Sequence, residues 1–214
     1  MQQALDALTE RLTAAPLVPL IQSDDPDEAL HVMRALARGG IRVVEVVLRT
    51  ERAYDVARAL AAAEDDITVG VGTVLSEQHA RDAVATGAEF LVSPGFDPAV
   101  VRTSHELNTP ILPGVATASE AQCAWNLGLR KLKFFPATQS GGVGMLKALS
   151  SVFRDVQFMP TGGISPANVA DFVALDAVLA CGGSWLTPSA AIAAGDWDAI
   201  TKLAADGLAL CAPN

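Results

Sequence analysis

Short runs of β-branched and other apolar residues alternate with longer alanine-rich stretches along the 214 residues of the chain. Each short run is typical of a buried strand, and each longer stretch has the spacing of an amphipathic helix. Strands that alternate with helices through short connections favour a parallel sheet covered by helices. We expect strands at residues 17–21, 41–48, 67–71, 89–92, 110–112, 130–134, 156–159 and 177–181.

The helices expected between these strands carry start and stop signals. Asp24 and Asp25 precede a proline at position 26, and two glycines at 39 and 40 mark the end of the same helix. We expect helices at residues 2–14, 26–38, 52–63, 77–86, from 98, at 119–127, from 141, at 166–174 and beyond 181.

Eight strand–helix units predict a (β/α)8 barrel, or TIM barrel, with an extra N-terminal helix. The length of 214 residues falls within the range of this fold. A doubly wound open sheet is the alternative architecture, but no GxGxxG fingerprint follows the first strand. Because no linker or low-complexity tract interrupts the chain, we expect a single domain over residues 1–214.

Composition narrows the classes of function. A net charge of −9 argues against nucleic-acid binding, which needs a basic surface. No apolar run approaches the length of a membrane span and no signal-peptide pattern opens the chain, so we expect no membrane partner and a cytoplasmic location. The cysteines lack CxxC spacing and the histidines lack HExxH spacing, which predicts reduced thiols and no metal site.

Lys133 lies near the end of an otherwise apolar strand, in the sequence LKFFP at residues 132–136. An ammonium group is costly to bury, so apolar surroundings favour a neutral amine. A neutral lysine amine can attack a carbonyl carbon and form a Schiff base. The alternative is a lysine whose ammonium reaches solvent from a strand end, which is the commoner case for an isolated lysine.

Two glycine pairs follow later strands and point to phosphate binding. Thr161 precedes Gly162 and Gly163, and Ser184 follows the second pair at Gly183. Glycine lets the backbone approach an anion closely, and each pair stands before an expected helix whose N-terminus favours negative charge. Barrel enzymes often bind phosphate with the loops after strands seven and eight, where these pairs fall. A tight turn without a ligand is the alternative for either pair, but a reactive lysine beside both predicts a sugar-phosphate lyase.

Further polar residues fall at the carboxyl ends of the expected strands, where barrel enzymes build their active sites. Because side chains two residues apart share a face of a strand, Glu45 and Arg49 point the same way. A carboxylate that shares the barrel mouth with a reactive lysine can move protons during catalysis. A salt bridge between Glu45 and Arg49 is the alternative. The residues that converge on this end are Glu45, Arg49, Thr73, Lys133, Thr161 and Ser184.

Six segments of the chain resemble segments of one family of class I aldolases, in the same order and at a similar spacing. Its members act on 2-keto-3-deoxy-6-phosphogluconate (KDPG), in the Entner–Doudoroff pathway, and on 4-hydroxy-2-oxoglutarate (KHG). The resemblance covers nearly the whole chain, and any one segment alone is a weak signal. The segments are GIRVVEVVLRT at 40–50, VGTVL at 71–75, VSPG at 92–95, LKFFPA at 132–137, PTGGISP at 160–166 and GGSWL at 182–186.

The resemblance implies a role for each matching residue. Lys133 corresponds to the lysine that forms the Schiff base with the keto group, and Glu45 to the general acid and base. Arg49 and Thr73 correspond to the site for the pyruvate carboxylate, and Phe135 to the pocket wall beside the lysine. The full set of implied substrate contacts is Arg49, Thr73, Pro94, Phe135, Thr161, Gly162, Gly163, Gly183 and Ser184.

The resemblance also implies reversible cleavage of KDPG to pyruvate and glyceraldehyde 3-phosphate by a homotrimer that needs no cofactor. The expected partners are therefore a phosphorylated keto-sugar acid and pyruvate. Cleavage of KHG, cleavage of the phosphogalactonate epimer of KDPG, and a non-catalytic phosphosugar-binding barrel stay open as alternatives. A metal-dependent pyruvate aldolase would need a cluster of acidic or histidine ligands, which the rim residues do not supply.

Overall fold

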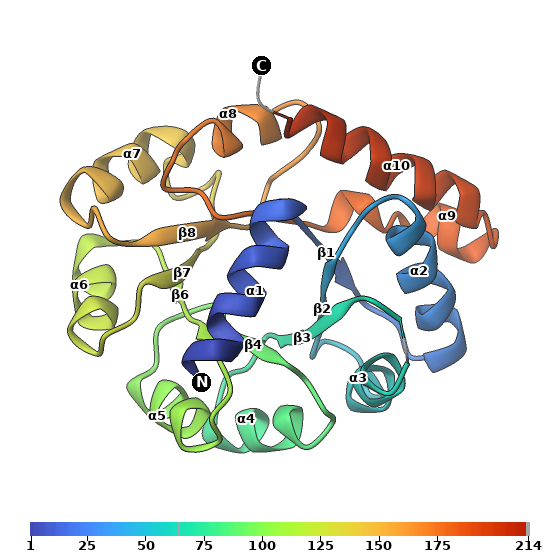
Figure 1. Cartoon of the computed structure of the whole chain (residues 1–214), viewed down its shortest axis with the longest axis horizontal. Coiled ribbons are helices and arrows are strands. Elements are labelled where there is room, and N and C mark those ends of the chain that lie inside the picture. Colours follow the sequence, from blue (N-terminus) through green and yellow to red (C-terminus); the bar gives the residue numbers. More distant parts are fainter. Residues whose placement is uncertain (64, 213–214) are drawn as a thin grey trace.

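In the computed structural model, which describes residues 1–63 and 65–212, parallel strands curl into a barrel with helices packed around it (Figure 1). Each strand runs parallel to its neighbours, as strands joined by helical crossovers do. The strands are β1 (Leu17–Ile21), β2 (Val43–Val47), β3 (Thr68–Gly72), β4 (Phe90–Val92), β5 (Ile111–Leu112), β6 (Gly114–Val115), β7 (Lys131–Phe134), β8 (Gln157–Pro160) and β9 (Cys181–Gly183).

Several helices begin at side chains that cap them. The Asp25 carboxylate accepts hydrogen bonds from the N–H groups of Asp27 and Glu28, and Thr117 and Glu120 form a capping box. Within the described residues, no helix has both the length and the apolar character needed to cross a membrane. The helices are α1 (Gln2–Ala14), α2 (Pro26–Arg38), α3 (Ala53–Ala61), α4 (Glu77–Val84), α5 (Pro98–Glu106), α6 (Ala118–Asn126), α7 (Gly142–Val152), α8 (Val169–Val173), η1 (Ser184–Leu186), α9 (Ser189–Ala193) and α10 (Trp197–Leu210).

The barrel closes at two seams. At the first, Pro113 divides one long strand, because β5 before it pairs with β4 and β6 after it pairs with β7. At the second, single parallel bridges join Phe158 to Val178 and Thr161 to Gly182, and β9 pairs with β1. The strands therefore form a continuous ring, and the predicted (β/α)8 barrel with an extra N-terminal helix is confirmed.

Several elements differ from their predicted limits, and at two of them the pairing and hydrogen bonds give the reason. The last strand begins at Cys181, where the prediction ended it, because residues 177–180 join β8 through a single bridge. Helix α8 begins later than predicted. The reason is that the Asn168 side chain accepts a hydrogen bond from the Ser165 N–H and donates one to the Gly163 carbonyl. These bonds offer the backbone an alternative to the helix and hold it in a turn.

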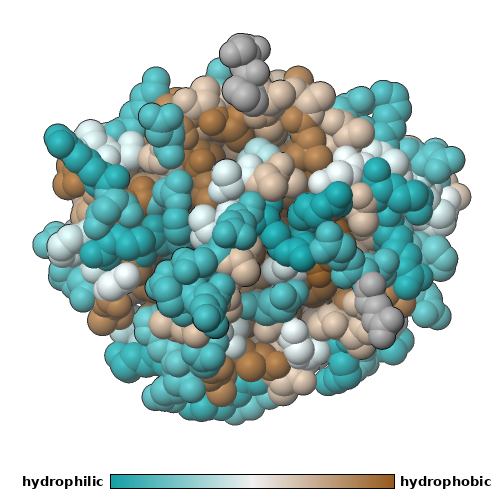
Figure 2. Space-filling view, in the orientation of Figure 1, coloured by the Kyte–Doolittle hydropathy of each residue, from teal (hydrophilic) through white to brown (hydrophobic). Residues whose placement is uncertain are grey.

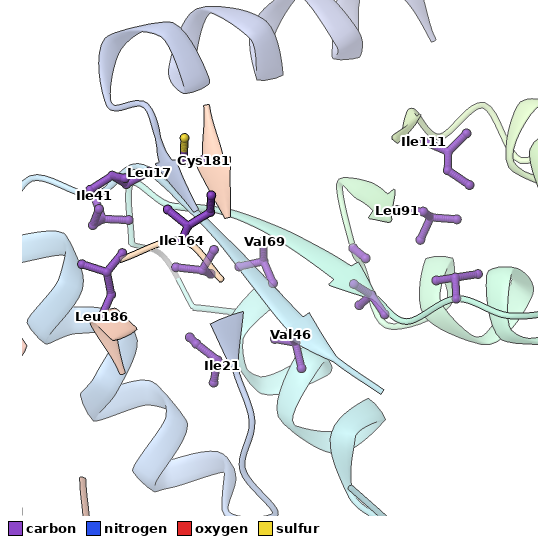
Figure 3. Close-up of a cluster of buried hydrophobic side chains, with 14 of the residues drawn as sticks. Leu17, Ile21, Ile41, Val46, Val69, Leu91, Ile111, Ile164, Cys181 and Leu186 are labelled. Carbon is purple, nitrogen blue, oxygen red and sulfur yellow. The ribbon is translucent and has the colours of Figure 1, made fainter. Parts of the chain in front are cut away.

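The larger hydrophobic cluster lies between the barrel wall and the surrounding helices. Neighbouring strands contribute Val46 of β2, Val69 of β3 and Leu91 of β4 (Figure 3). Helices supply the partners, among them Val56 of α3 and Val100 of α5. Because side chains alternate across a strand, the residues between these strand positions face the interior of the barrel.

A second cluster fills the barrel interior. It contains Val43, Phe90 and Met159 from three strands, and Leu8 and Leu12 from α1. Helix α1 therefore covers the N-terminal end of the barrel, where Figure 1 shows it crossing the ring of strands. The centre of this face is largely hydrophilic (Figure 2), so α1 turns its apolar side inward and its polar side outward. Apolar packing thus closes this end, and the carboxyl ends of the strands form the mouth.

The cysteines are free thiols in different surroundings. Cys123 is exposed, Cys181 is buried and Cys211 is half-buried. Burial raises the pKa of the Cys181 thiol, and it raises the pKa of Cys211 to about 11. Both groups stay protonated near neutral pH, and a protonated thiol is a poor nucleophile. The surroundings of Cys181 and Cys211 agree with the prediction of reduced thiols.

Replacing Gly70 by alanine is expected to destabilise the barrel by about 1–3 kcal/mol. An added Cβ would lie 2.2 Å from the ring of Phe90, which is fully buried in the interior cluster. Gly144→Ala in α7 is the matched control, because nothing lies within 4 Å of its added Cβ and a helix favours alanine over glycine. Urea unfolding followed by circular dichroism compares the two variants, and equal midpoints would contradict the packing argument.

Candidate active site

Lys133 of β7 and Glu45 of β2 meet inside the barrel, although 88 positions separate them in sequence. The Lys133 Nζ atom donates a hydrogen bond of 3.4 Å to Glu45 Oε1, and the two groups form an ion pair. Lys133 is 5% exposed and Glu45 is fully buried. Removing two charges from water is costly, and each charge offsets part of the cost of the other. Glu45 therefore pairs with Lys133 and does not form the alternative salt bridge to Arg49.

A glycine on the neighbouring strand provides the space for the Glu45 carboxylate. Gly72 of β3 pairs with Val47, and a Cβ at Gly72 would lie 1.8 Å from Glu45 Oε1. The second carboxylate oxygen, Oε2, is buried and has no hydrogen-bond partner in the described residues. A buried acceptor without a partner is unfavourable, so this oxygen is available to a hydroxyl group of a ligand or to water.

Phe135 forms an aromatic wall beside the lysine. The Lys133 Nζ atom lies 5.4 Å from the centroid of the Phe135 ring, which is within the range of a cation–π interaction. Phe135 follows β7 directly and stands two residues after the lysine, on the same side of the chain. The predicted neighbourhood of these two residues is therefore present.

A cavity of about 130 Å³ at the carboxyl ends of the strands collects most of the predicted substrate contacts. Leu20 and Ile164 add apolar surface to its lining. The Thr161 hydroxyl oxygen is buried and has no hydrogen-bond partner in the part of the chain that the structure describes. The predicted residues that line the cavity are Arg49, Phe135, Thr161, Gly162, Gly163, Gly183 and Ser184.

Backbone amides at this cavity are free to bind an anion. Gly162 and Gly163 have left-handed backbone angles, with φ values of 97° and 77°, which favour glycine. Neither N–H group donates a hydrogen bond to another group among residues 1–63 and 65–212. Successive amides of this kind form an anion-binding nest. Helix α8 has only five residues and starts at Val169, and a 3-10 turn follows Gly183, so no α-helix begins directly after either glycine pair.

Arg49 is an exposed cation at the edge of the cavity. Its guanidinium group forms no ion pair or hydrogen bond with another described side chain. A planar guanidinium binds a carboxylate or a phosphate through two parallel hydrogen bonds, so Arg49 is available to an anionic ligand. The described residues contain no group of three or more His, Cys, Asp or Glu side chains placed to hold a metal ion.

An adjoining cavity of about 380 Å³ contains residues that the sequence did not single out. It shares Leu20, Arg49 and Ser184 with the first cavity, and Gln22 also lines it. Alternation along β1 is a signal that identifies Leu20, because Val18, two residues earlier, belongs to the interior cluster. Gln22 follows the strand in a loop without a recognisable motif, so no sequence signal identifies it.

Thr73 and Pro94 follow β3 and β4 at the same end of the barrel but line neither cavity. Thr73 has a φ of 65°, a left-handed angle that is uncommon for threonine. This angle ends the strand alternation on which its predicted orientation rested. Pro94 packs against the strand wall, since a Cβ at Gly114 would lie 2.1 Å from its carbonyl oxygen. The binding roles expected of Thr73 and Pro94 stay predictions.

The structure is a parallel β/α barrel with a buried lysine–glutamate pair beside an anion-binding cavity. These are the features that a Schiff-base lyase requires. The sequence profile of the family "KDPG and KHG aldolase" matches residues 8–203 of the chain. The chain belongs to this family and is an aldolase, a carbon–carbon lyase. The family expected from the six sequence segments is confirmed.

Individual relatives agree with this assignment. The KHG/KDPG aldolase of Escherichia coli (strain K12) is 45% identical over 197 residues, which cover 92% of each chain. The KDPG aldolase of Legionella pneumophila is 38% identical, with a TM-score of 0.88, and the match covers 92% of this chain and 96% of that one. That protein was solved with pyruvate captured at low pH as a covalent carbinolamine intermediate. The KDPG aldolase of Zymomonas mobilis ZM4, solved with 3-phosphoglycerate, is 36% identical with a TM-score of 0.87, covering 94% of each chain.

Gly72→Ala is expected to lower aldolase turnover by about 10²-fold while the barrel stays folded. The added Cβ would lie 1.8 Å from Glu45 Oε1 and would force the carboxylate away from Lys133. Gly95→Ala is the matched control, because it follows β4 at the same end of the barrel and nothing lies within 4 Å of its added Cβ. Cleavage rates are measured beside circular-dichroism spectra, and equal rates in both variants would show that the position of the carboxylate is unimportant.

Proposed function

We propose that the chain cleaves KDPG reversibly to pyruvate and glyceraldehyde 3-phosphate through a Schiff base on Lys133, as a step of the Entner–Doudoroff pathway. The buried ion pair between Lys133 and Glu45 carries the proposal, because it places a nucleophile 3.4 Å from a group that can move protons. Relatives named KDPG aldolase, at 36–38% identity over nearly the whole chain, support the choice of substrate.

The reaction begins when Lys133 transfers a proton to Glu45 and its neutral amine attacks the keto carbon of the substrate. A C–N bond forms, and the product is a carbinolamine. Glu45 then protonates the hydroxyl group of the carbinolamine, which departs as water and leaves a protonated Schiff base. The Phe135 ring lies beside this cationic nitrogen and stabilises it through its negative face.

Cleavage of the carbon chain requires a base for the C4 hydroxyl group of the substrate. Glu45 takes that proton, the C3–C4 bond breaks, and glyceraldehyde 3-phosphate leaves as the electron pair moves to the Schiff-base nitrogen. The resulting enamine is protonated at C3 by Glu45, and water then releases pyruvate from Lys133. The Glu45 Oε2 atom, which lacks a partner among the described residues, supports this role. A positioned acid–base group contributes about 10²–10⁴ in rate.

The two anionic ends of the substrate are assigned to different groups. Arg49 and Thr73 bind the carboxylate, since a guanidinium fork matches carboxylate geometry. Pro94 shapes the loop beside them. The phosphoryl group lies at the cavity where free backbone amides and a hydroxyl group gather. The residues assigned to the phosphoryl end are Thr161, Gly162, Gly163, Gly183 and Ser184.

KHG is a second proposed substrate. The family profile includes both activities, and the Escherichia coli relative at 45% identity is named KHG/KDPG aldolase. Cleavage of KHG also yields pyruvate, so it uses the same chemistry at Lys133 and Glu45. KHG carries no phosphoryl group, and its cleavage therefore needs the lysine end of the site but not the phosphate end.

Family membership also supports the proposals for assembly and setting. We propose that the chain works as a single domain, as a homotrimer and in the cytoplasm, with pyruvate and a phosphorylated keto-sugar acid as its small-molecule partners. The protonated Schiff base itself accepts the electron pair, so the mechanism uses no metal or organic cofactor. The net charge of −9 gives no support to a nucleic-acid partner.

Borohydride reduction in the presence of pyruvate is expected to inactivate the protein and to leave a pyruvyl adduct on Lys133. Reduction converts the Schiff base into a stable secondary amine, which peptide mass spectrometry locates. Lys131 is the matched control because it stands in the same strand, β7, and burial lowers its pKa, which makes it a second candidate nucleophile. Lys131→Ala should keep the adduct, and Lys133→Ala should lose both the adduct and turnover. A folded wild-type protein without an adduct on Lys133 would refute the mechanism.

Glu45→Gln is expected to slow KDPG cleavage by about 10²–10⁴-fold, while trapping of pyruvate on Lys133 becomes slower but still occurs. The amide keeps the shape of the side chain but cannot accept a proton. Turnover and adduct yield are measured on the same preparation, with Glu10→Gln on the exposed side of α1 as the control. Complete loss of trapping would contradict this expectation and show that Lys133 cannot form the Schiff base without the Glu45 carboxylate.

A further inference from the structure

Two side chains hold the anion-binding segment at residues 162–165 by its carbonyl oxygens. The Gly162 carbonyl accepts hydrogen bonds from the Thr138 N–H at 3.1 Å and from the Thr138 hydroxyl at 3.2 Å. The Gly163 carbonyl accepts one from the Asn168 side-chain amide at 2.9 Å. The oxygen of the same Asn168 amide accepts a hydrogen bond of 2.9 Å from the Ser165 N–H. Thr138 follows β7 and Asn168 precedes α8, so the segment is held from two sides.

Fixing a carbonyl also fixes the amide that belongs to the same peptide plane. In a planar trans peptide the C=O of one residue and the N–H of the next point in opposite directions. Thr138 therefore sets the direction of the Gly163 N–H, and Asn168 sets that of the Ile164 N–H. Neither of these N–H groups donates to an acceptor within the described ranges. Both amides are directed by their bound carbonyls and are free to bind a ligand.

The Thr138 hydroxyl also lies close against the glycine segment. A Cβ at Gly163 would lie 1.9 Å from the Thr138 hydroxyl oxygen, so the absence of a side chain there allows the two loops to touch. The same oxygen lies 2.9 Å from Gln139 Oε1, so its single proton is shared between two acceptors. The position of the hydroxyl is thus set by three neighbours, which makes it a rigid support.

We propose that Thr138 and Asn168 are positioning residues that aim the Gly163 and Ile164 amides and thereby set the preference of the enzyme for phosphorylated substrates. The inference rests on the proposed cleavage of KDPG and adds residues that do not touch the substrate. Thr161 lines the same cavity, and its buried hydroxyl has no partner in the described chain, which is an independent sign that a polar ligand belongs there. A phosphoryl group offers acceptor oxygens to all of these donors.

The preference follows from the division of the site into two ends. A substrate without a phosphoryl group does not bind the Gly163 and Ile164 amides. The chemistry at Lys133 depends instead on the ion pair with Glu45. Disturbing the supports should therefore weaken the binding of phosphorylated substrates and leave the reaction of pyruvate with Lys133 intact. A support that only stabilised the fold would weaken both.

The test compares Thr138→Val, Asn168→Ala and the double variant with the wild type in two assays. One is the KM for KDPG, and the other is the exchange of pyruvate methyl hydrogens with solvent deuterium, followed by NMR. The exchange uses Lys133 and involves no phosphoryl group. Each single variant should raise the KM for KDPG about five- to tenfold and leave the exchange within about twofold of wild type. Thr138→Ser should restore the wild-type KM, and Asn126→Ala at the exposed end of α6 is the matched control.

An unchanged KM for KDPG in the double variant would overturn the proposal, and so would a parallel fall in pyruvate exchange. Inorganic phosphate is a direct probe, and its competition with KDPG should weaken in the same variants. A wild-type protein that exchanges pyruvate hydrogens but does not cleave KDPG would refute the proposed substrate instead. In that case calorimetric binding of inorganic phosphate, compared between wild type and double variant, still decides the role of Thr138 and Asn168.

Discussion

The ion pair between Lys133 and Glu45 is the constraint on which the mouth of the barrel depends. Two charges removed from water are tolerated when they face each other, and loss of either partner leaves the other uncompensated. Their meeting requires room, which Gly72 supplies beside the carboxylate, and Gly114 of β6 is paired in register with Lys133. On its other side Lys133 is paired in register with Met159 of the apolar interior. The pair thus lies at the boundary between a packed core and an open site.

The two ends of the barrel differ in character, because apolar packing closes one end and the candidate active site lies at the other. At the N-terminal end, Leu8 and Leu12 of α1 belong to one apolar cluster with Val43 and Phe90, and this cluster fills the interior of the barrel. At the other end, the Glu45 Oε2 atom and the amides of Gly162 and Gly163 have no hydrogen-bond partner among residues 1–63 and 65–212, which is unfavourable in a folded protein without a ligand. A closed and well-packed end is what allows the other end to hold such groups in place.

Local patterns predicted the fold and the position of Lys133 and Glu45 at the barrel mouth, because strand and helix periodicity and strand alternation can be recognised within short segments. The supporting residues could not be found in this way. Gly72 matters through its register with the neighbouring strand, and no local pattern states which glycine faces which carboxylate. Near Asn168, the proline before it is a typical helix start, but the side-chain hydrogen bonds override that preference and extend the turn. At Thr73 a left-handed backbone angle interrupts the strand alternation that the prediction assumed.

An acidic chain that binds an anionic substrate must do so with local groups, because a net charge of −9 repels anions at long range. The charge of Lys133 is met by Glu45, which leaves Arg49 as the cation at the cavity edge and backbone amides as the other donors. A backbone N–H group has the same chemistry in every residue. A sequence therefore controls the direction of such a group through glycine, which allows an unusual backbone angle, and through side chains that bind the carbonyl of the same peptide. Selectivity for the phosphoryl group therefore depends on residues such as Thr138 and Asn168, which lie one hydrogen bond away from the ligand site.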